Sequence, residues 1–311
     1  MRNPELAAKA LEGLRRYQSA EPASPPPERP VVADVAGTML RDCGGSGPTV
    51  VLVPSLINPP TILDLESSRS LAQALTGGNS VLLLDWGAAR ARAGLDLTGH
   101  VEERLRPLLG AVGPAVLVGY CLGGTLALAA AAREPAVRAV ATLASPWRFE
   151  VYPASARQAL TELWRSSRPV AERLGFLPME VLQAAFWQID PERIVAKFAH
   201  FADLASGSPE ARAFVGIEDW ANAGEPLPLP AAAQMVEQLF GAGAEGLGPL
   251  PDCAMLHVTA SDDRIVPAAT AAPGPSIAAQ AGHVGMVVGR RAGDLLHRPL
   301  RTWLEGLAPR G

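Results

Sequence analysis

The chain has 311 residues, of which 48% are hydrophobic and 19% are charged, and its formal net charge is −4 at pH 7. A chain of this composition packs into a globular protein, so a disordered chain or a coiled coil is excluded. The sequence has neither a basic excess nor a long cluster of lysine and arginine, which is the electrostatic footprint of nucleic-acid binding. We therefore expect no nucleic-acid partner.

The three cysteines, Cys43, Cys121 and Cys253, are odd in number and do not have metal-ligand spacing. This pattern predicts neither a disulfide framework nor a zinc site, so we expect no metal or other cofactor and a reducing, cytoplasmic compartment. The N-terminal sequence carries acidic residues and lacks the apolar run of a secretory signal, and we do not interpret it as one.

One uncharged stretch, residues 107–132, is long enough to span a bilayer. Pro114 and the glycines at 119, 123 and 124 interrupt it, and a buried parallel strand also reads as continuous apolar sequence. A strand followed by a helix is the better interpretation. We therefore expect no transmembrane segment.

Residues 1–30 are predicted to form a short amphipathic helix and a Pro-rich linker, and the folded domain begins near Val31. Beyond it, short apolar runs bounded by Gly, Pro and Asn alternate with segments of helical period. The predicted strands are 49–54, 80–86, 115–121 and 136–146, and the predicted helices are 69–77, 100–112 and 125–132. This alternation over residues 31–146 predicts a mostly parallel, doubly wound sheet with helices on both faces.

The strand pattern then stops and helical periods replace it. The predicted helices of this region are 155–166, 178–188, 191–205 and 231–241. Strand signals return at 253–260 and, more weakly, at 276–281, before a terminal helix over 295–306. We predict a helical cap over residues 147–244, inserted into a core that residues 245–311 complete.

A cysteine between glycines ends one of the predicted strands. In the stretch VLVGYCLGG, Cys121 follows the apolar run 116–118 and precedes helix-forming residues from Thr125 onward. It therefore falls on a strand-to-helix turn, where the flanking glycines let the backbone and the helix approach closely. A lone cysteine is more often a small buried apolar residue, but this context is typical of a nucleophile elbow.

Candidates for an acid and a base follow in the chain order that α/β-hydrolases use, with each residue at the carboxyl end of a strand. Asp262 and Asp263 follow the predicted strand 253–260, and His283 follows 276–281. The remaining histidines are poorer candidates, because they fall within predicted helices, a strand or the C-terminal tail. The residues alone leave open which aspartate is the acid, or whether both only mark a turn.

These residue types suit nucleophilic catalysis. A free thiol is mostly protonated at neutral pH, so Cys121 needs an imidazole, here His283, to take its proton or to pair with the thiolate. A carboxylate on the other ring nitrogen would hold the tautomer and stabilise the imidazolium. The oxyanion needs backbone N–H donors, for which we predict Leu122 and either Ser55 or Leu56.

Six segments taken together resemble the polyhydroxyalkanoate synthases, over most of residues 31–290. They are VPSLINPPTILDL (53–65), SVLLLDWG (80–87), GYCLGG (119–124), IEDWANAGEPLPLP (217–230), DRIVP (263–267) and AGHVGMVVG (281–289). The motif positions of that family correspond to Asn58, Asp64, Cys121, Glu218, Asp219, Trp220, Asp263 and His283. The resemblance implies an α/β-hydrolase fold with an inserted helical cap, a Cys-His-Asp triad and, of the two aspartates, Asp263 as the acid.

The elbow alone is less specific, because dienelactone hydrolases have a near-identical one, although they lack a large cap and the E-D-W segment. The chain also departs from the synthase pattern. Arg264 replaces the histidine of D-H-I-V-P, Pro59 and Pro60 replace a basic-aromatic pair, and the interval to His283 is shorter. Polymerising members have a longer, Trp-rich C-terminal stretch. The resemblance therefore implies acyl transfer by the triad more securely than it implies polymerisation.

The resemblance implies acyl transfer from 3-hydroxyacyl-CoA thioesters through a covalent acyl-Cys121 intermediate. The acceptor is left open: a hydroxyl of the next acyl unit makes a synthase, and water makes a thioesterase, an esterase or a dienelactone-hydrolase-like enzyme. A non-catalytic, granule-associated protein is a third interpretation, since fold alone does not guarantee activity. The expected partner is an acyl-CoA or ester substrate, and a homodimer and a polyester granule surface are further candidates, the latter placing the protein at granules in the cytoplasm.

Overall fold

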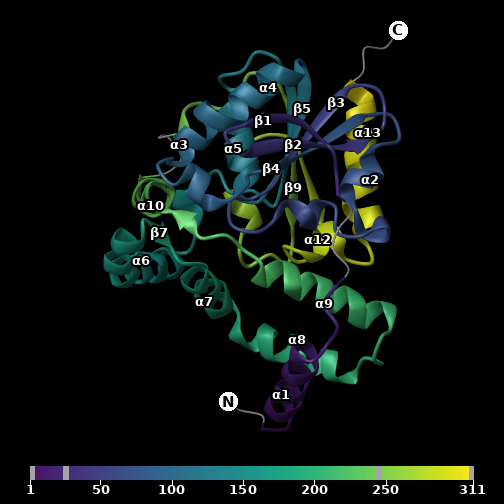
Figure 1. Cartoon of the computed structure of the whole chain (residues 1–311), viewed down its shortest axis with the longest axis vertical. Coiled ribbons are helices and arrows are strands. Elements are labelled where there is room, and N and C mark those ends of the chain that lie inside the picture. Colours follow the sequence, from purple (N-terminus) through teal and green to yellow (C-terminus); the bar gives the residue numbers. More distant parts are fainter. Residues whose placement is uncertain (1–3, 24–27, 243–246, 308–311) are drawn as a thin grey trace.

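The computed structural model of the chain describes residues 4–23, 28–242 and 247–307. Its centre is an eight-stranded sheet of order β1-β2-β4-β3-β5-β6-β9-β10, with helices on both faces (Figure 1). The strands are β1 (Val31–Val35), β2 (Thr38–Gly44), β3 (Thr49–Val53), β4 (Ser80–Asp85), β5 (Ala115–Tyr120), β6 (Val137–Leu143), β9 (Ala254–Ala260) and β10 (Ser276–Ala279). From β4 to β10 neighbouring strands run parallel, which confirms the predicted mostly parallel sheet.

An antiparallel hairpin, β1 with β2, extends the sheet beyond β4 and is absent from the predicted elements. It turns through Ala36 and Gly37, whose φ angles are 49° and 83°. Such left-handed turn residues match the twist of two paired strands. Strand β1 is largely exposed, so it lacks the continuous apolar run by which the buried strands are recognised.

The helices are α1 (Pro4–Gln18), α2 (Leu71–Leu75), α3 (Leu97–His100), α4 (Arg106–Val112), α5 (Leu122–Ala131), α6 (Ala154–Leu174), α7 (Met179–Ile189), α8 (Pro191–Asp203), α9 (Pro209–Asn222), α10 (Leu229–Ala233), α11 (Phe240–Ala242), α12 (Gly285–Val288) and α13 (Arg298–Leu307). Short π-helical segments extend three of them: η4 (Val101–Leu105), η6 (Gln234–Leu239) and η9 (Gly293–His297). Helix α9 was not among the predicted helices, although the predicted motif segment 217–230 begins within it.

The sheet has a separate apolar core on each face. Successive side chains of a strand point to opposite faces, so in β3 Val51 and Val53 join one core while Val50 and Leu52 join the other. Helix α5 packs into the first core, and α2, α12 and α13 pack into the second. With both faces covered, the strands read as continuous apolar runs, which is why they were recognisable in the sequence.

The chain between β6 and β9 is an insertion of helices α6 to α11 with two short paired strands, β7 (Phe176–Leu177) and β8 (Leu227–Pro228). Figure 1 shows this insertion below the sheet, with α1 beside α8 at its far end. The predicted limit at residue 244 lies outside the described residues, as do residues 24–27 of the predicted linker. The domain boundaries therefore stay a prediction.

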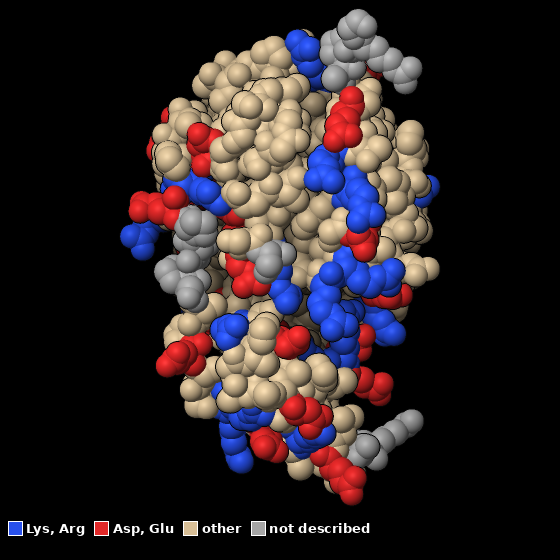
Figure 2. All heavy atoms as spheres, turned by 90° about the vertical axis from the view of Figure 1, so that its right-hand side faces the viewer, with Lys and Arg blue, Asp and Glu red and all other residues tan. Residues whose placement is uncertain are grey.

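The uncharged stretch 107–132 is divided among α4, β5 and α5. Within the described ranges no helix combines the length and the apolar character that crossing a membrane requires. On the face of the molecule in Figure 2, basic and acidic side chains are interspersed. Ion pairs between neighbouring residues of a segment include Arg298 with Asp294 and Arg69 with Glu66.

Candidate active site

Cys121 occupies a strained turn between β5 and α5. Its φ and ψ are 55° and −132°, which a side chain other than glycine rarely adopts, and it is the N-cap residue of α5. A Cβ atom on Gly119 would lie 2.3 Å from the Cα of Gly124, and one on Gly123 would lie 2.2 Å from the backbone oxygen of Val53. Only glycine fits at these two positions, and the elbow therefore packs directly against the end of β3.

Helix α5 begins at Leu122, immediately after the cysteine, and not near Thr125 as the composition indicated. The reason is that the elbow turns the chain within one residue, so Leu122 and the two glycines already have helical geometry. The first N–H groups of a helix have no partner within it, which leaves the Leu122 N–H available to a ligand.

His283 and Asp263 follow β10 and β9 and form a buried pair. The His283 Nδ1 donates to the Asp263 Oδ2 at 2.6 Å, and the Asp263 side chain is 0% exposed. The other carboxylate oxygen accepts the N–H groups of Ile265 and Val266 at 2.8 and 2.9 Å. Asp262 is exposed and contacts the hydroxyl of Ser261, so the aspartate that bonds the histidine is Asp263.

Cys121 lies close enough to the His283 imidazole for its charge to act on the ring. Burial alone would lower the pKa of His283, but the charge of Cys121 and the interactions with Asp263 outweigh burial and raise the pKa to about 10. The ring of Tyr120 lies 5.0 Å from the imidazole, centroid to centroid, and its hydroxyl donates to the His283 carbonyl at 3.4 Å. Burial raises the Tyr120 pKa well above 10, so this hydroxyl keeps its proton.

The loop after β3 faces the elbow because Gly123 contacts Val53 and Pro54. This loop contains Ser55 and Leu56, which are 8% and 2% exposed. The structure thus brings the predicted oxyanion donors Leu122, Ser55 and Leu56 to the carboxyl edge of the sheet that also holds the cysteine, the histidine and Asp263. The catalytic roles of these residues stay a prediction.

The three residues of the E-D-W segment connect α9 to three different parts of the molecule. The Trp220 Nε1 donates to the Pro59 carbonyl at 2.9 Å, on the loop after β3. Glu218 is buried and pairs with the Lys197 ammonium through both carboxylate oxygens at 2.8 Å. Asp219 accepts the hydroxyl of Tyr17 and the N–H of Ala23, from the N-terminal segment.

Asn58 belongs to the same system of contacts, since its side-chain amide donates to the Ala221 carbonyl at 3.3 Å. None of these hydrogen bonds and ion pairs, among the residues that the structure describes, reaches the candidate triad. Asn58 and Trp220 instead hold the loop after β3 against α9, while Glu218 and Asp219 connect α9 to α8 and to the N-terminal segment. We therefore expect their importance to be structural. No sequence signal separates this role from a catalytic one, because motif matching does not reveal partners.

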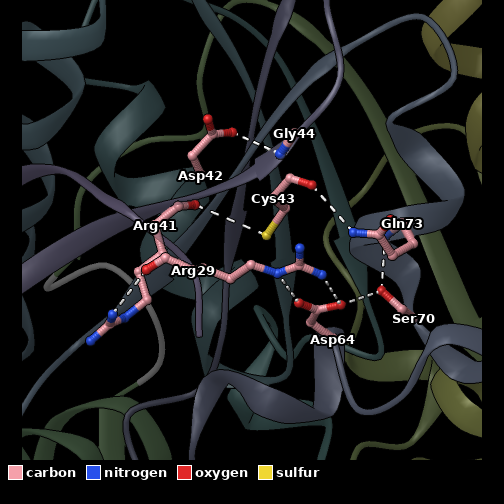
Figure 3. Close-up of polar contacts among 8 residues, drawn as sticks. All are labelled: Arg29, Arg41, Asp42, Cys43, Gly44, Asp64, Ser70 and Gln73. Carbon is pink, nitrogen blue, oxygen red and sulfur yellow. Dashed lines mark hydrogen bonds and ion pairs between the residues drawn. The ribbon is translucent and has the colours of Figure 1, made fainter. Parts of the chain in front are cut away.

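Asp64 is a second buried aspartate among the positions that match the synthase motifs, and Figure 3 shows its partners. The Arg29 guanidinium donates to both carboxylate oxygens, at 2.8 and 3.3 Å, and the Ser70 hydroxyl donates to Oδ1 at 2.6 Å. The backbone N–H of Gln73 donates to that hydroxyl, which caps α2. Asp64 thus connects the end of the linker to the core.

Cys43 lies beside this network and differs from Cys121. Its thiol is buried, and burial, together with the charge of Asp64, raises its pKa to about 12. Burial also raises the pKa of Cys253. Neither thiol lies on a turn between a strand and a helix.

Tyr152 lies near the site and was not among the residues predicted from the sequence. The Tyr152 hydroxyl donates to the Ile265 carbonyl at 3.1 Å, and burial and the charges of Cys121 and Asp263 raise its pKa. Arg264, the departure from D-H-I-V-P, pairs with Asp190 at the start of α8 at 3.3 Å. Among the described residues, no group of three or more His, Cys, Asp or Glu side chains could hold a metal ion.

The fold and the site define the class of the protein. The chain belongs to the α/β-hydrolase family, whose model matches residues 50–301. The structure is similar to E-2-(acetamidomethylene)succinate hydrolase, with a TM-score of 0.53 at 17% identity over 89% of this chain and 100% of that one. A thermophilic esterase from Thermogutta terrifontis gives a TM-score of 0.50 at 17% identity, covering 91% and 99% of the two chains. At this identity the similarity concerns the fold alone.

Within that family, the sequence is similar to poly(3-hydroxyalkanoate) polymerase subunits named PhaC. The identity is 26% to the protein of Haloarcula marismortui, over 67% of this chain and 46% of that one. It is 28% to the protein of Haloferax mediterranei, over 61% and 41%. The aligned part thus spans less than half the length of these relatives. The resemblance to polyhydroxyalkanoate synthases predicted from the motifs is confirmed.

Proposed function

We propose that the chain transfers acyl groups from 3-hydroxyacyl-CoA thioesters through a covalent acyl-Cys121 intermediate. The observation that carries this proposal is the placement of Cys121 at the N-terminus of α5, near the imidazole of His283, whose Nδ1 is held by Asp263. The raised pKa of His283 fits an imidazolium beside a thiolate, which is the reactive form of a cysteine.

In the first step the Cys121 thiolate attacks the thioester carbonyl, and the oxyanion forms at the N–H groups of Leu122 and of Leu56 or Ser55. The bond from the carbonyl carbon to the coenzyme A sulfur breaks, and the His283 imidazolium gives its proton to the leaving thiolate. One thioester replaces another, so this step is nearly balanced in free energy.

In the second step His283 takes the proton of an acceptor O–H, and the acceptor oxygen attacks the acyl-enzyme. The acyl group passes to that oxygen and the Cys121 thiolate is restored. A hydroxyl of another acyl unit extends a polyester, and water gives the free acid. We include in the proposal a helical cap over residues 147–244 that limits access of water to Cys121.

The test is a single-turnover reaction with 3-hydroxybutyryl-CoA. The release of the coenzyme A thiol, the intact mass of the protein and the identity of the product are measured. We expect an acyl adduct on Cys121, and Cys121→Ala should lower the rate by about 10⁶-fold, as loss of the nucleophile does in comparable triads. Cys121→Ser should also lose most activity, because a hydroxyl is far harder to deprotonate than a thiol.

An adduct on Cys43 or Cys253, or undiminished turnover in Cys121→Ala, would overturn the proposal. Polymer as the product supports the synthase, and free acid supports the hydrolase alternatives. Absence of any adduct with a range of acyl-CoA thioesters would favour a non-catalytic, granule-associated protein.

A further inference from the structure

The backbone around the Leu56 N–H is held by side chains from outside its own loop. The carbonyl of Pro54 accepts the indole N–H of Trp86 at 2.9 Å, and the carbonyl of Leu56 accepts a guanidinium N–H of Arg92 at 3.3 Å. The peptide unit that carries the Leu56 N–H lies between these two anchored peptides. The next carbonyl, that of Ile57, accepts the N–H of Glu225 at 2.8 Å.

Arg92, from the short helix η3 (Ala89–Arg92), is unusual because it is only 2% exposed and its hydrogen-bond partners are neutral. Besides the Leu56 carbonyl, it contacts the His100 Nε2 at 3.3 Å and the Gly87 carbonyl at 3.5 Å. Burial lowers its pKa to about 10, so it is still charged at neutral pH. Burying a guanidinium is costly, and one kept without a bonded carboxylate calls for a physical explanation.

His100 orients this guanidinium. Its Nδ1 donates to the Asp96 carbonyl at 2.6 Å, which leaves the Nε2 of the neutral ring to accept from Arg92. Burial lowers the pKa of His100 to about 4, so the ring is neutral at physiological pH. The rings of His100 and Trp86 pack edge to face at 5.7 Å, so the two side chains that reach the loop belong to one packed cluster.

We propose that Arg92 is a positioning residue for the oxyanion hole. Its guanidinium, oriented by His100, holds the Leu56 carbonyl. This contact keeps the N–H of Leu56, in the preceding peptide unit, aimed at the place where the oxyanion forms. An oxyanion hole is effective because its donors are oriented before the reaction and need no reorganisation during it. This inference rests on the function proposed above and takes Leu56, one of the two alternatives named there, as the second donor.

The experiment compares two reactions of the same thiol in the full chain. Acylation by 3-hydroxybutyryl-CoA, and by p-nitrophenyl acetate as a second donor, passes through an oxyanion. Alkylation of Cys121 by iodoacetamide needs the thiolate but forms no oxyanion. In Arg92→Met we expect acylation to slow by about 10²-fold, the cost of a misplacement near 1 Å, while alkylation keeps its rate.

Arg90→Met is the matched control, because Arg90 lies on the same short helix but is exposed, and it should change neither rate. Arg92→Lys keeps the charge and one hydrogen bond, so its acylation rate should lie between those of the native chain and Arg92→Met. This variant carries the test if Arg92→Met does not fold.

Equal losses of acylation and alkylation would mean that Arg92 only supports the fold, and unchanged acylation would mean that it does not position the donor. Either result overturns the inference. Failure of the proposed function is recognised separately, because Cys121→Ala would then keep its turnover whatever the Arg92 variants do.

Discussion

Two buried histidines, His283 and His100, differ in the direction of their pKa shifts. Both rings are almost completely buried. In both, burial is the largest single effect on the pKa, and it acts to lower the pKa. His283 has the charge of Cys121 on one side and Asp263 on the other, and its pKa rises to about 10. For His100, burial outweighs the hydrogen bond to the Asp96 carbonyl, the charge of Arg92 acts in the same direction as burial, and the pKa falls to about 4.

Burial therefore does not decide what a histidine can do, since the charges beside it can reverse the direction of the pKa shift. A ring that is protonated beside a thiol can give a proton to a leaving group. A ring that is held neutral can only donate one hydrogen bond and accept another, which suits it to orient a neighbour. The predictions below test each half of this contrast.

After loss of the nucleophile itself, the largest effect is expected from Asp263→Asn. Asparagine cannot stabilise an imidazolium and would turn an N–H toward the His283 Nδ1, so acylation should fall by up to about 10⁴-fold, as the same change does in Ser-His-Asp enzymes. Single-turnover acylation measures the loss. Asp262→Asn is the matched control, because Asp262 is the exposed neighbour. Equal losses in the two variants would contradict the assigned contrast between the aspartates.

A moderate effect on stability is expected from His100→Gln. A histidine in the unfolded chain takes up a proton near pH 6.5, whereas His100 in the folded chain does so only near pH 4. Unfolding therefore takes up a proton between these values, and stability is lost as pH falls through that range. The native chain should lose about 2 kcal/mol between pH 7 and pH 5 that the variant does not lose, since glutamine has no proton to gain.

Urea unfolding at the two pH values measures this difference, and the other histidines cancel because both chains contain them. The glutamine side-chain oxygen can still accept from Arg92, so stability at pH 7 should change little. A loss between pH 7 and pH 5 that is the same in both chains would show that His100 is not held neutral.

The smallest effect is expected from Cys43→Ala. The Cys43 thiol has a pKa of about 12, so it is almost entirely protonated and unreactive at neutral pH. Acylation and the rate of Cys121 alkylation should be unchanged, and stability should fall by about 1 kcal/mol through loss of a small buried group. Peptide mass mapping of the native chain after alkylation checks that Cys43 is unreactive. Prominent labelling of Cys43 in that chain would contradict the distinction between the two thiols.

The contacts of Asp64 and Asp263 show how far motifs lead. Both positions belong to the motifs shared with the polyhydroxyalkanoate synthases, and both carboxylates are buried. Asp64 bonds the guanidinium of Arg29, which keeps its proton at neutral pH, whereas Asp263 bonds an imidazole beside a thiol. The motif indicated that each aspartate matters, but only the partner distinguishes a structural role from a candidate catalytic one.

The sequence by itself determined the features that depend on residues close together in the chain. The alternation of buried strands and helices, the G-x-C-x-G-G turn and the order of cysteine, aspartate and histidine are all readable, because backbone geometry and strand ends are encoded locally. The parallel sheet then brings those strand ends to one edge.

Only the tertiary structure decided which side chains meet. Arg92 and His100 are separated from Leu56 by 36 or more residues, and no local pattern indicates that a buried guanidinium bonds that carbonyl. The same holds for Trp220 on the Pro59 carbonyl and for the neutral state of His100. These contacts are set by packing between distant segments, and the protonation states follow from the burial and the charges that such packing creates.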